Sequence, residues 1–214
     1  RIAQRSTRKY NLSPDYSNID EEKLIERCNK FVTTDNTFVS YANNQSVLYF
    51  AGCMTALTPA ISQSTLSVLR KAGVRYEIMD KDGGICCGRP MLMAGRLEQA
   101  EEMVKKNTEI IKSSGADTLL LSCPICYKIF KEKYDLEGIE VLHHTEYIDR
   151  LISEGRLSLS MAETRFVYHD PCELGRGCGI YEQPRNVVSK AGILVEAEKK
   201  EKESVCCGGS LGSL

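Results

Sequence analysis

The chain has 214 residues, of which 42% are hydrophobic and 27% are charged, and its formal net charge is -1. This composition is typical of a soluble globular protein that is long enough for one large or two small domains. With balanced charge and no apolar run of about 18 residues, we expect no nucleic acid partner and no direct membrane span.

The first 45 residues are polar, and we expect them to form a lead-in segment with one amphipathic helix in the stretch DEEKLIERCNKF. Cys28 lies in this helix, at what we interpret as a half-buried apolar position, so we leave it out of the candidate sites. The chain starts at Arg1 and ends in the glycine-rich stretch GGSLGSL, and we therefore expect it to be a piece of a longer protein.

After residue 45, apolar runs of strand length alternate with amphipathic stretches of helix length. Strands are expected at 46–52, 74–80, 117–122 and 139–144. Helices are expected at 59–71, 96–115, about 125–134 and 145–155, the last with Thr145 as its N-cap. This alternation predicts an α/β fold with mostly parallel sheets and crossover helices.

The second half of the chain begins with the same pattern. It predicts a strand at 165–170, a helix from Pro184 to about Lys190 and a short strand at 192–197, followed by a solvated surface connection at 196–204.

The cysteines repeat along the chain. Cys172 lies 119 positions after Cys53, and Cys207 lies 120 positions after Cys87. The repeat predicts two tandem, partly duplicated units, at 46–160 and 161–214, after the lead-in at 1–45. The second unit is expected to be truncated, because the counterpart of the Cys-x-x-Cys pair at Cys123 would fall beyond the last residue.

Each predicted strand of the first unit leads into cysteine. Cys53 follows the first strand, Cys86 and Cys87 follow the second, and Cys123 follows the third, with Cys126 at the start of the next helix. Since the carboxyl ends of parallel strands meet at one edge of a sheet, we expect all five thiols to gather there.

Five gathered thiols indicate a particular kind of site. A single zinc ion takes at most four, neighbouring side chains diverge towards different atoms, and a disulfide between adjacent cysteines needs a strained ring. A polynuclear iron-sulfur centre fits the count best. A structural zinc site with one spare thiol, or simply reduced core thiols, are the alternatives. Clustered cysteines without a secretion signal also favour metal ligation in a reducing compartment, and so a cytoplasmic protein.

Several stretches resemble a known family: YFAGC, ICCGRP and SCPICYKIF, then HDPCELGRGCGIYEQPR followed by CCGG. They are similar to the cysteine-rich CCG domain of heterodisulfide reductase catalytic subunits and of iron-sulfur subunits of glycolate oxidase, anaerobic glycerol-3-phosphate dehydrogenase and lactate-utilisation systems. The resemblance covers residues 46–214. It implies a non-cubane 4Fe-4S centre held by the five cysteines Cys53, Cys86, Cys87, Cys123 and Cys126. It also implies an incomplete second site, for a second cluster or for zinc, at Cys172, Cys206 and Cys207.

Other residues near these motifs have two interpretations each. Cys178 is either a substitute ligand of the second site or a free loop thiol. His169 has a functional interpretation, in which it donates to cluster sulfur or binds metal, and a structural one, in which it packs or caps. Arg89 has a functional interpretation, in which it neutralises cluster charge or binds an anionic substrate, and a second one, in which it simply lies on the surface. Lys128 and Arg176 are considered for the same roles, whereas His143 and His144, which have no cysteine nearby in the sequence, are interpreted as structural.

The expected function is that of an iron-sulfur redox subunit in a multi-subunit oxidoreductase, with a flavoprotein or other iron-sulfur subunits as partners. The centre either relays electrons or reduces a disulfide substrate. We favour the relay, because the chain shows no substrate-binding constellation beyond the cysteines. The sequence also carries no nucleotide-binding fingerprint. The alternative is a zinc-stabilised interaction module without redox activity. Partner subunits could also hold the protein at the inner membrane.

Overall fold

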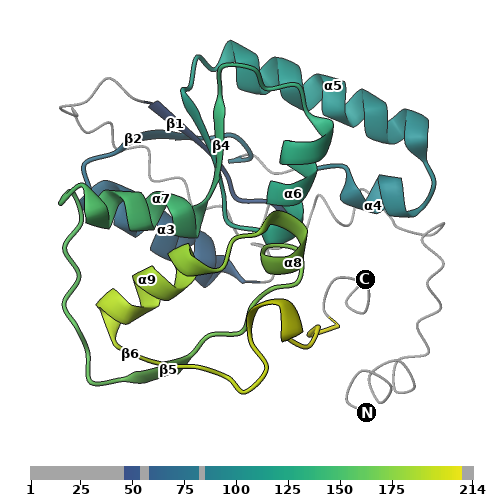
Figure 1. Cartoon of the computed structure of the whole chain (residues 1–214). Coiled ribbons are helices and arrows are strands. Elements are labelled where there is room, and N and C mark those ends of the chain that lie inside the picture. Colours follow the sequence, from purple (N-terminus) through teal and green to yellow (C-terminus); the bar gives the residue numbers. More distant parts are fainter. Residues whose placement is uncertain (1–45, 54–57, 82–84, 209–214) are drawn as a thin grey trace.

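The computed structural model describes residues 46–53, 58–81 and 85–208 (Figure 1). The predicted lead-in segment, with its helix and Cys28, lies outside these ranges, as do residues 209–214 of the glycine-rich end.

A four-stranded parallel sheet forms the centre of the structure. Its strands are β1 (Ser46–Phe50), β2 (Arg75–Ile78), β3 (Thr118–Leu121) and β4 (Glu140–His143), in the order β2-β1-β3-β4. β1 and β3, in the middle of this order, have almost entirely buried apolar side chains, as strands covered on both faces require. The predicted α/β class with a parallel sheet is confirmed.

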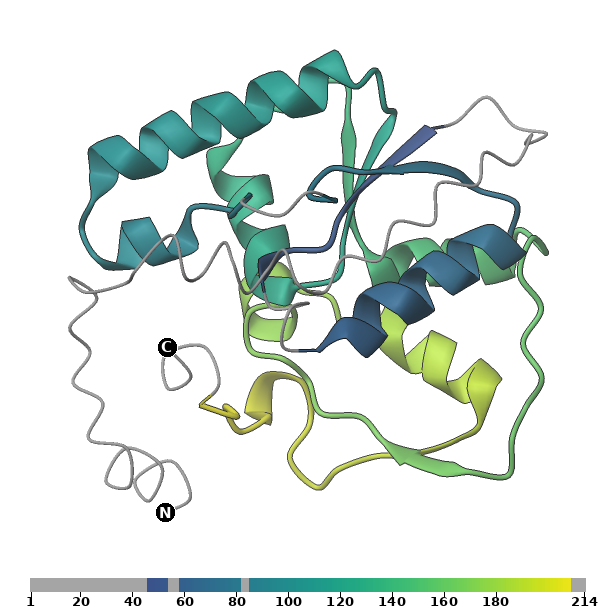
Figure 2. The ribbon, with the colours of Figure 1, turned by 180° about the vertical axis from the view of Figure 1, so that it is seen from behind.

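Helices cover both faces of this sheet (Figures 1 and 2). On one face, Leu48, Leu119 and Leu121 pack against α5 (Leu97–Ser113) and α6 (Pro124–Lys133). On the other, their sequence neighbours, such as Tyr49 and Leu120, pack against α3 (Pro59–Lys71) and α7 (His144–Ser153). Because successive strand side chains point to opposite faces, one strand sequence contributes to both cores.

The start of α7 differs from the sequence prediction. The helix begins at His144 and its N-cap is His143, so the prediction of Thr145 as the cap is wrong. The backbone N–H of His143 donates to Oε2 of Glu146 at 2.9 Å, and this contact supports an N-cap two residues before the expected one. Two short helices were not predicted at all: α4 (Arg89–Met93) and α8 (Gly175–Cys178).

The second region holds the two-stranded parallel sheet of β5 (Arg165–Val167) and β6 (Ile193–Val195), with α9 (Glu182–Ala191) between them in sequence and the short 3-10 helix η3 (Glu201–Glu203) after β6. β5 pairs with β6 as β1 pairs with β2, at a nearly equal spacing along the chain. α9 contacts α7, and Leu174 and Ile180, on either side of α8, are buried in the core that α6 also lines. Figure 1 shows α8 beside α6 and α9 beside α7. The boundary at residues 160 and 161 stays a prediction.

Candidate metal centre

The five cysteines of the first region lie at the carboxyl edge of the main sheet. Cys53 follows β1, the Cys86–Cys87 doublet follows β2, Cys123 is the N-cap residue of α6, and Cys126 lies in the first turn of that helix. Cys87 and Cys126 are buried, and the other three are half-buried.

These thiols interact in series, from Cys53 to Cys86, then to Cys87, Cys126 and Cys123. The hydrogen bond of the Cys126 thiol to Cys123, helped by the backbone N–H groups that open α6, lowers the pKa of Cys123 to about 6. Hydrogen bonding to Cys126 and then to Cys86 likewise holds the pKa of Cys87 well below its ordinary value. Contacts with neighbouring thiols, together with burial, raise the pKa of Cys53 and of Cys126. The contact with Cys53 lowers the pKa of Cys86, but the contact with Cys87 and burial outweigh it and raise this pKa to about 12. Thiolate character is therefore concentrated on two of the five sulfurs before any metal binds.

The five thiols follow one another in a series and do not surround one common point. Within the described ranges, no three Cys, His, Asp or Glu side chains surround a common position as a single metal ion requires. A series of five sulfurs suits a centre with several metal atoms better than one tetrahedral ion, which takes four ligands. That these cysteines bind metal stays a prediction.

Gly52 allows the closest backbone approach to this series. Its φ is +81°, in the left-handed region, and a Cβ built there would lie 3.5 Å from Sγ of Cys126. Any side chain at this position would therefore occupy space next to a candidate ligand sulfur and strain the turn that carries Cys53.

Buried polar side chains hold the backbone beside the cysteines. Asp80, which follows β2, accepts the N–H groups of Ala51 and Gly52 at 3.0 and 2.7 Å, just before Cys53. Burial raises the pKa of Asp80, and the two N–H donors counteract this rise in part. The carboxylate thus fixes the loop between β1 and Cys53 from the neighbouring strand.

The Cys86–Cys87 doublet is held through its carbonyl groups. Asn107, on α5, donates from Nδ2 to the Cys86 carbonyl at 2.8 Å and to the Tyr134 hydroxyl at 3.0 Å. That hydroxyl donates in turn to the Cys87 carbonyl at 3.1 Å. Both side chains are buried. We call these two residues the Asn107–Tyr134 pair.

His143 lies beside the Cys123 segment in space. Its Nε2 is 3.2 Å from the carbonyl of Ser122, the residue before Cys123, so this nitrogen carries the proton. Its ring also packs edge-on against Tyr127, next to Cys126. Burial, and then the adjacent His144, hold the pKa of His143 well below its ordinary value, so it is neutral. The structural role expected for His143 agrees with these contacts, which are made to the sequence neighbours of Cys123 and Cys126.

Neither Asp80 nor the Asn107–Tyr134 pair was singled out from the sequence, although two of these three residues carried a signal. Asn107 is a polar residue on the apolar stripe of α5, in line with Ala100 and Ile111. Asp80 is an acidic residue at the end of a predicted buried strand. A polar side chain at such a position requires a buried partner.

Two of the three basic residues considered as anion or cluster partners, Arg89 and Lys128, meet at a single carboxylate, whereas Arg176 donates to the carbonyl groups of Lys202 and Ser204. Arg89 pairs with Oε1 of Glu173 at 3.1 Å, and Nζ of Lys128 lies 3.6 Å from Oε2 of the same side chain. Since Glu173 follows Cys172, these contacts join the two cysteine regions. Glu173 also opposes the lowering of the Cys123 pKa.

The second set of cysteines is only partly brought together. Sγ of Cys172 lies 3.9 Å from Sγ of Cys206, whereas Cys178 packs against the core shared with α6. Cys206 and Cys207 are both exposed. His169 uses Nε2 to donate to the carbonyl of Val205 at 2.7 Å, a structural contact beside Cys206.

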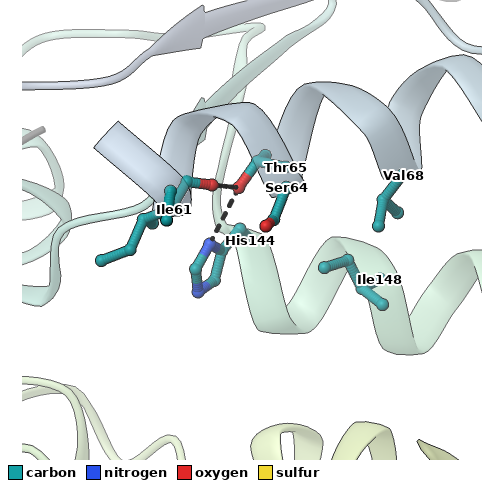
Figure 3. A pocket seen from close by; sticks show the side chains of 7 residues that line it. Ile61, Ser64, Thr65, Val68, His144 and Ile148 are labelled. Atoms are coloured by element: carbon teal, nitrogen blue, oxygen red, sulfur yellow. Dashed lines mark hydrogen bonds between the residues drawn. The ribbon is translucent and has the colours of Figure 1, made fainter. Parts of the chain in front are cut away.

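A shallow apolar hollow lies elsewhere, between α3 and α7 (Figure 3). Ile61, Val68 and Ile148 line it, and Nδ1 of His144 faces the Thr65 hydroxyl at 3.5 Å. No cysteine lines this hollow, and it adds no ligand to the thiol series.

A parallel sheet covered by helices, with five cysteines along its carboxyl edge, defines a cysteine-rich α/β domain. The chain belongs to the family described as the Cysteine-rich domain (CCG), whose sequence profile matches residues 47–131 and 166–213. The two matched stretches correspond to the two regions that carry the cysteine repeat, so the predicted resemblance is confirmed.

Curated relatives include redox proteins of several kinds. A subunit of the dihydromethanophenazine:CoB--CoM heterodisulfide reductase of Methanosarcina acetivorans is 33% identical over 186 residues, which are 81% of this chain and 45% of the relative. A subunit of the fumarate reductase (CoM/CoB) of Methanothermobacter marburgensis is 33% identical over 77% of this chain and 33% of its own length. The EtfAB:quinone oxidoreductase of Syntrophomonas wolfei is 32% identical over 78% of this chain and 24% of its own length.

The chain therefore spans less than half of the length of these relatives. No solved structure shows significant similarity to it. Among the helices in the described ranges, none combines the length and the apolar character that crossing a bilayer requires.

Proposed function

We propose that this chain is the cysteine-rich part of an iron-sulfur redox subunit, and that Cys53, Cys86, Cys87, Cys123 and Cys126 hold a non-cubane 4Fe-4S centre. The single observation that carries this proposal is the series of five interacting thiols at one sheet edge. Such a centre, when bound, supplies one-electron transfer.

The chain's own residues would prepare the site for this centre. The backbone amides that open α6 stabilise a thiolate on Cys123. Asp80 and the Asn107–Tyr134 pair hold the loops that carry the other cysteines, and Gly52 leaves room beside Cys126. A site held from several elements keeps its ligands in place when the charge of the centre changes.

We infer that the role is an electron relay within a multi-subunit oxidoreductase, with a flavoprotein or another iron-sulfur subunit as partner. The names of the relatives support this inference, since two are subunits and one is an EtfAB:quinone oxidoreductase. Reduction of a disulfide substrate at the centre is the competing role, which the name of the heterodisulfide reductase relative favours. Cys86, Cys87, Cys123, Cys126, Cys172, Cys178 and Cys206 form no disulfide within the described ranges, which fits a reducing compartment such as the cytoplasm.

Anaerobic purification followed by iron and sulfide analysis and electron paramagnetic resonance tests the centre. We expect about four iron atoms per chain at this site and a brown colour. Cys126→Ser should abolish the signal, whereas the matched variant Cys178→Ser, outside the series, should keep it. Equal iron loss in both variants would contradict the proposed ligand set.

A zinc-stabilised interaction module is the second candidate, favoured by the number of thiols that could give a tetrahedral set. It predicts a colourless protein with stoichiometric zinc, no iron and no paramagnetic signal after reduction. The same anaerobic sample therefore decides between the two.

A further inference from the structure

A single carboxylate of the second region reaches the two elements that carry the buried cysteines of the first. Oε1 of Glu173 pairs with Nη2 of Arg89, two residues after Cys87, at 3.1 Å. Oε2 of the same side chain lies 3.6 Å from Nζ of Lys128, two residues after Cys126 on α6. One side chain thus ties a loop of the second region to two separate elements of the first.

This contact is largely shielded from water. The side chains of Glu173, Arg89 and Lys128 are only 17%, 24% and 26% exposed. α8, which lies beside α6 in Figure 1, packs closely against the contact. A Cβ built on Gly177 would lie 3.2 Å from Cδ of Lys128 and 3.5 Å from Oε2 of Glu173. Because the charges are shielded, salt screens their interaction less than it screens an exposed ion pair.

Apolar packing holds the same segment in place. Leu174 and Ile180, on either side of α8, are buried in the core that also contains Cys87 and Cys126. This core is continuous between the two regions. The segment that carries Glu173 is therefore fixed against the thiol series by packing as well as by charge.

The charge of Glu173 acts on cysteines of both regions. The hydrogen bond to Cys126 is the main cause of the lowered pKa of Cys123, and Glu173 opposes this lowering. Burial and the neighbouring Cys206 raise the pKa of Cys172, and Glu173 adds to this rise. One negative charge is therefore within electrostatic reach of both cysteine sites.

We propose that Glu173 couples the two cysteine sites: its carboxylate holds the second region against the first, and its fixed negative charge acts on both. The effect of this charge on a reduction potential rests on the iron-sulfur function proposed above, whereas the positioning role does not. A negative charge favours the oxidised form of a centre, because each added electron makes the centre more negative. The positive charge of Arg89 favours the reduced form for the same reason. Neutralising Glu173 and neutralising Arg89 should therefore shift the potential in opposite directions, although both substitutions break the same contact.

Hydrogen–deuterium exchange of the full chain, purified anaerobically, tests the positioning role. In Glu173→Gln, the amides of residues 172–180 should exchange about three- to ten-fold faster, because a shielded ion pair no longer opposes local opening. Arg89→Gln should act in the same direction. Glu132→Gln is the matched control, since Glu132 pairs with Lys128 at 3.6 Å but within α6. It should change this exchange by less than about two-fold.

A redox titration of the same samples, followed by electron paramagnetic resonance, tests the role of the charge. At a fixed potential, the ratio of oxidised to reduced centre should fall about three- to ten-fold in Glu173→Gln and rise by a similar factor in Arg89→Gln. At about 59 mV per ten-fold change for one electron, these are shifts of about 30–60 mV, upward and downward. The double variant should stay within about two-fold of the unsubstituted ratio and yet keep the fast exchange. Glu132→Gln, at a side chain that is 48% exposed, should shift the ratio by less than about two-fold.

Unchanged exchange in Glu173→Gln would overturn the positioning role. Potential shifts of the same sign in Glu173→Gln and Arg89→Gln would indicate loosening alone and overturn the role of the charge, as would equal shifts in Glu173→Gln and Glu132→Gln. Circular dichroism of each variant verifies folding. A sample without iron contradicts the iron-sulfur function, and the exchange of residues 172–180 then decides by itself whether Glu173 holds the two regions together.

Discussion

Tyr134→Phe tests whether buried hydrogen bonds hold the Cys86–Cys87 doublet. The substitution removes one hydroxyl, which accepts from Asn107 at 3.0 Å and donates to the Cys87 carbonyl at 3.1 Å. The aromatic ring keeps its packing against Phe130, at a centroid distance of 4.1 Å. Any decrease in stability should therefore come from the missing hydroxyl alone.

The expected magnitude follows from the groups left behind. An N–H of Asn107 and the Cys87 carbonyl both lose a partner in a buried site, and each such group costs about 1–3 kcal/mol. Asn107 keeps its bond to the Cys86 carbonyl, so we expect a total near the lower end, about 2–4 kcal/mol. For a chain of this length, 1 kcal/mol corresponds to about 2–4 °C in Tm, which gives a decrease of about 4–16 °C.

Thermal denaturation followed by circular dichroism on anaerobic protein measures this decrease. Tyr76→Phe is the matched control, because the half-buried Tyr76 hydroxyl makes no hydrogen bond to another residue in the described ranges. Its Tm should change by less than about 2 °C. Asn107→Leu combined with Tyr134→Phe should cost less than the sum of the two single changes. Additive losses, or equal losses in Tyr134→Phe and Tyr76→Phe, would refute the role of the pair.

Three further outcomes are expected. Asp170→Asn breaks a buried ion pair with Arg185 and should lower the free energy of unfolding, measured by urea titration, by about 3–5 kcal/mol. Glu140→Gln breaks an exposed ion pair and should lower it by less than about 1 kcal/mol, and equal decreases would contradict the argument from burial. Gly52→Ala and Gly73→Ala both place alanine at positive φ and should each cost about 1–2 kcal/mol of unfolding free energy. Only Gly52→Ala, which lies beside the proposed ligand sulfur of Cys126, should also lower the iron content, and iron loss in both variants would refute this role of the contact. Burial lowers the pKa of His144 from 6.5 to about 4, so between these pH values the unfolded chain binds a proton that the folded chain does not. The free energy of unfolding should therefore fall by up to about 3 kcal/mol as the pH decreases from 6.5 to 4, and His144→Gln should remove this part of the pH dependence.

Much of the structure of the first region could be predicted from the sequence, because the patterns that indicate its strands and helices are local. Apolar runs of strand length, such as the one that becomes β3, depend on residues a few positions apart. The position of Cys123 directly after such a run then indicates its place at the sheet edge, provided the strands are parallel. The cysteine repeat likewise indicated the parallel pairing of β5 with β6.

The N-cap of α7 and the short helix α8 could not be predicted from the sequence pattern, because both depend on contacts made in the folded chain. Glu146 accepts from the His143 backbone N–H, and the N-cap lies two positions before the expected Thr145. α8 contains two glycines in four residues, a poor helix former, and its neighbours Leu174 and Ile180 anchor it in the core next to α6. Tertiary burial therefore outweighed local propensity here.

The sequence by itself determined the α/β class, the family and the five thiols that follow three strands, because hydrophobic periodicity and cysteine spacing are properties of neighbouring residues. Only the tertiary structure decided which polar groups hold those thiols and which second-region sulfurs meet. Asp80, Asn107 and the contact between Cys172 and Cys206 each join segments more than twenty residues apart. Such contacts form because buried polar groups must find partners wherever the packed chain provides them, and this choice is made by the whole fold.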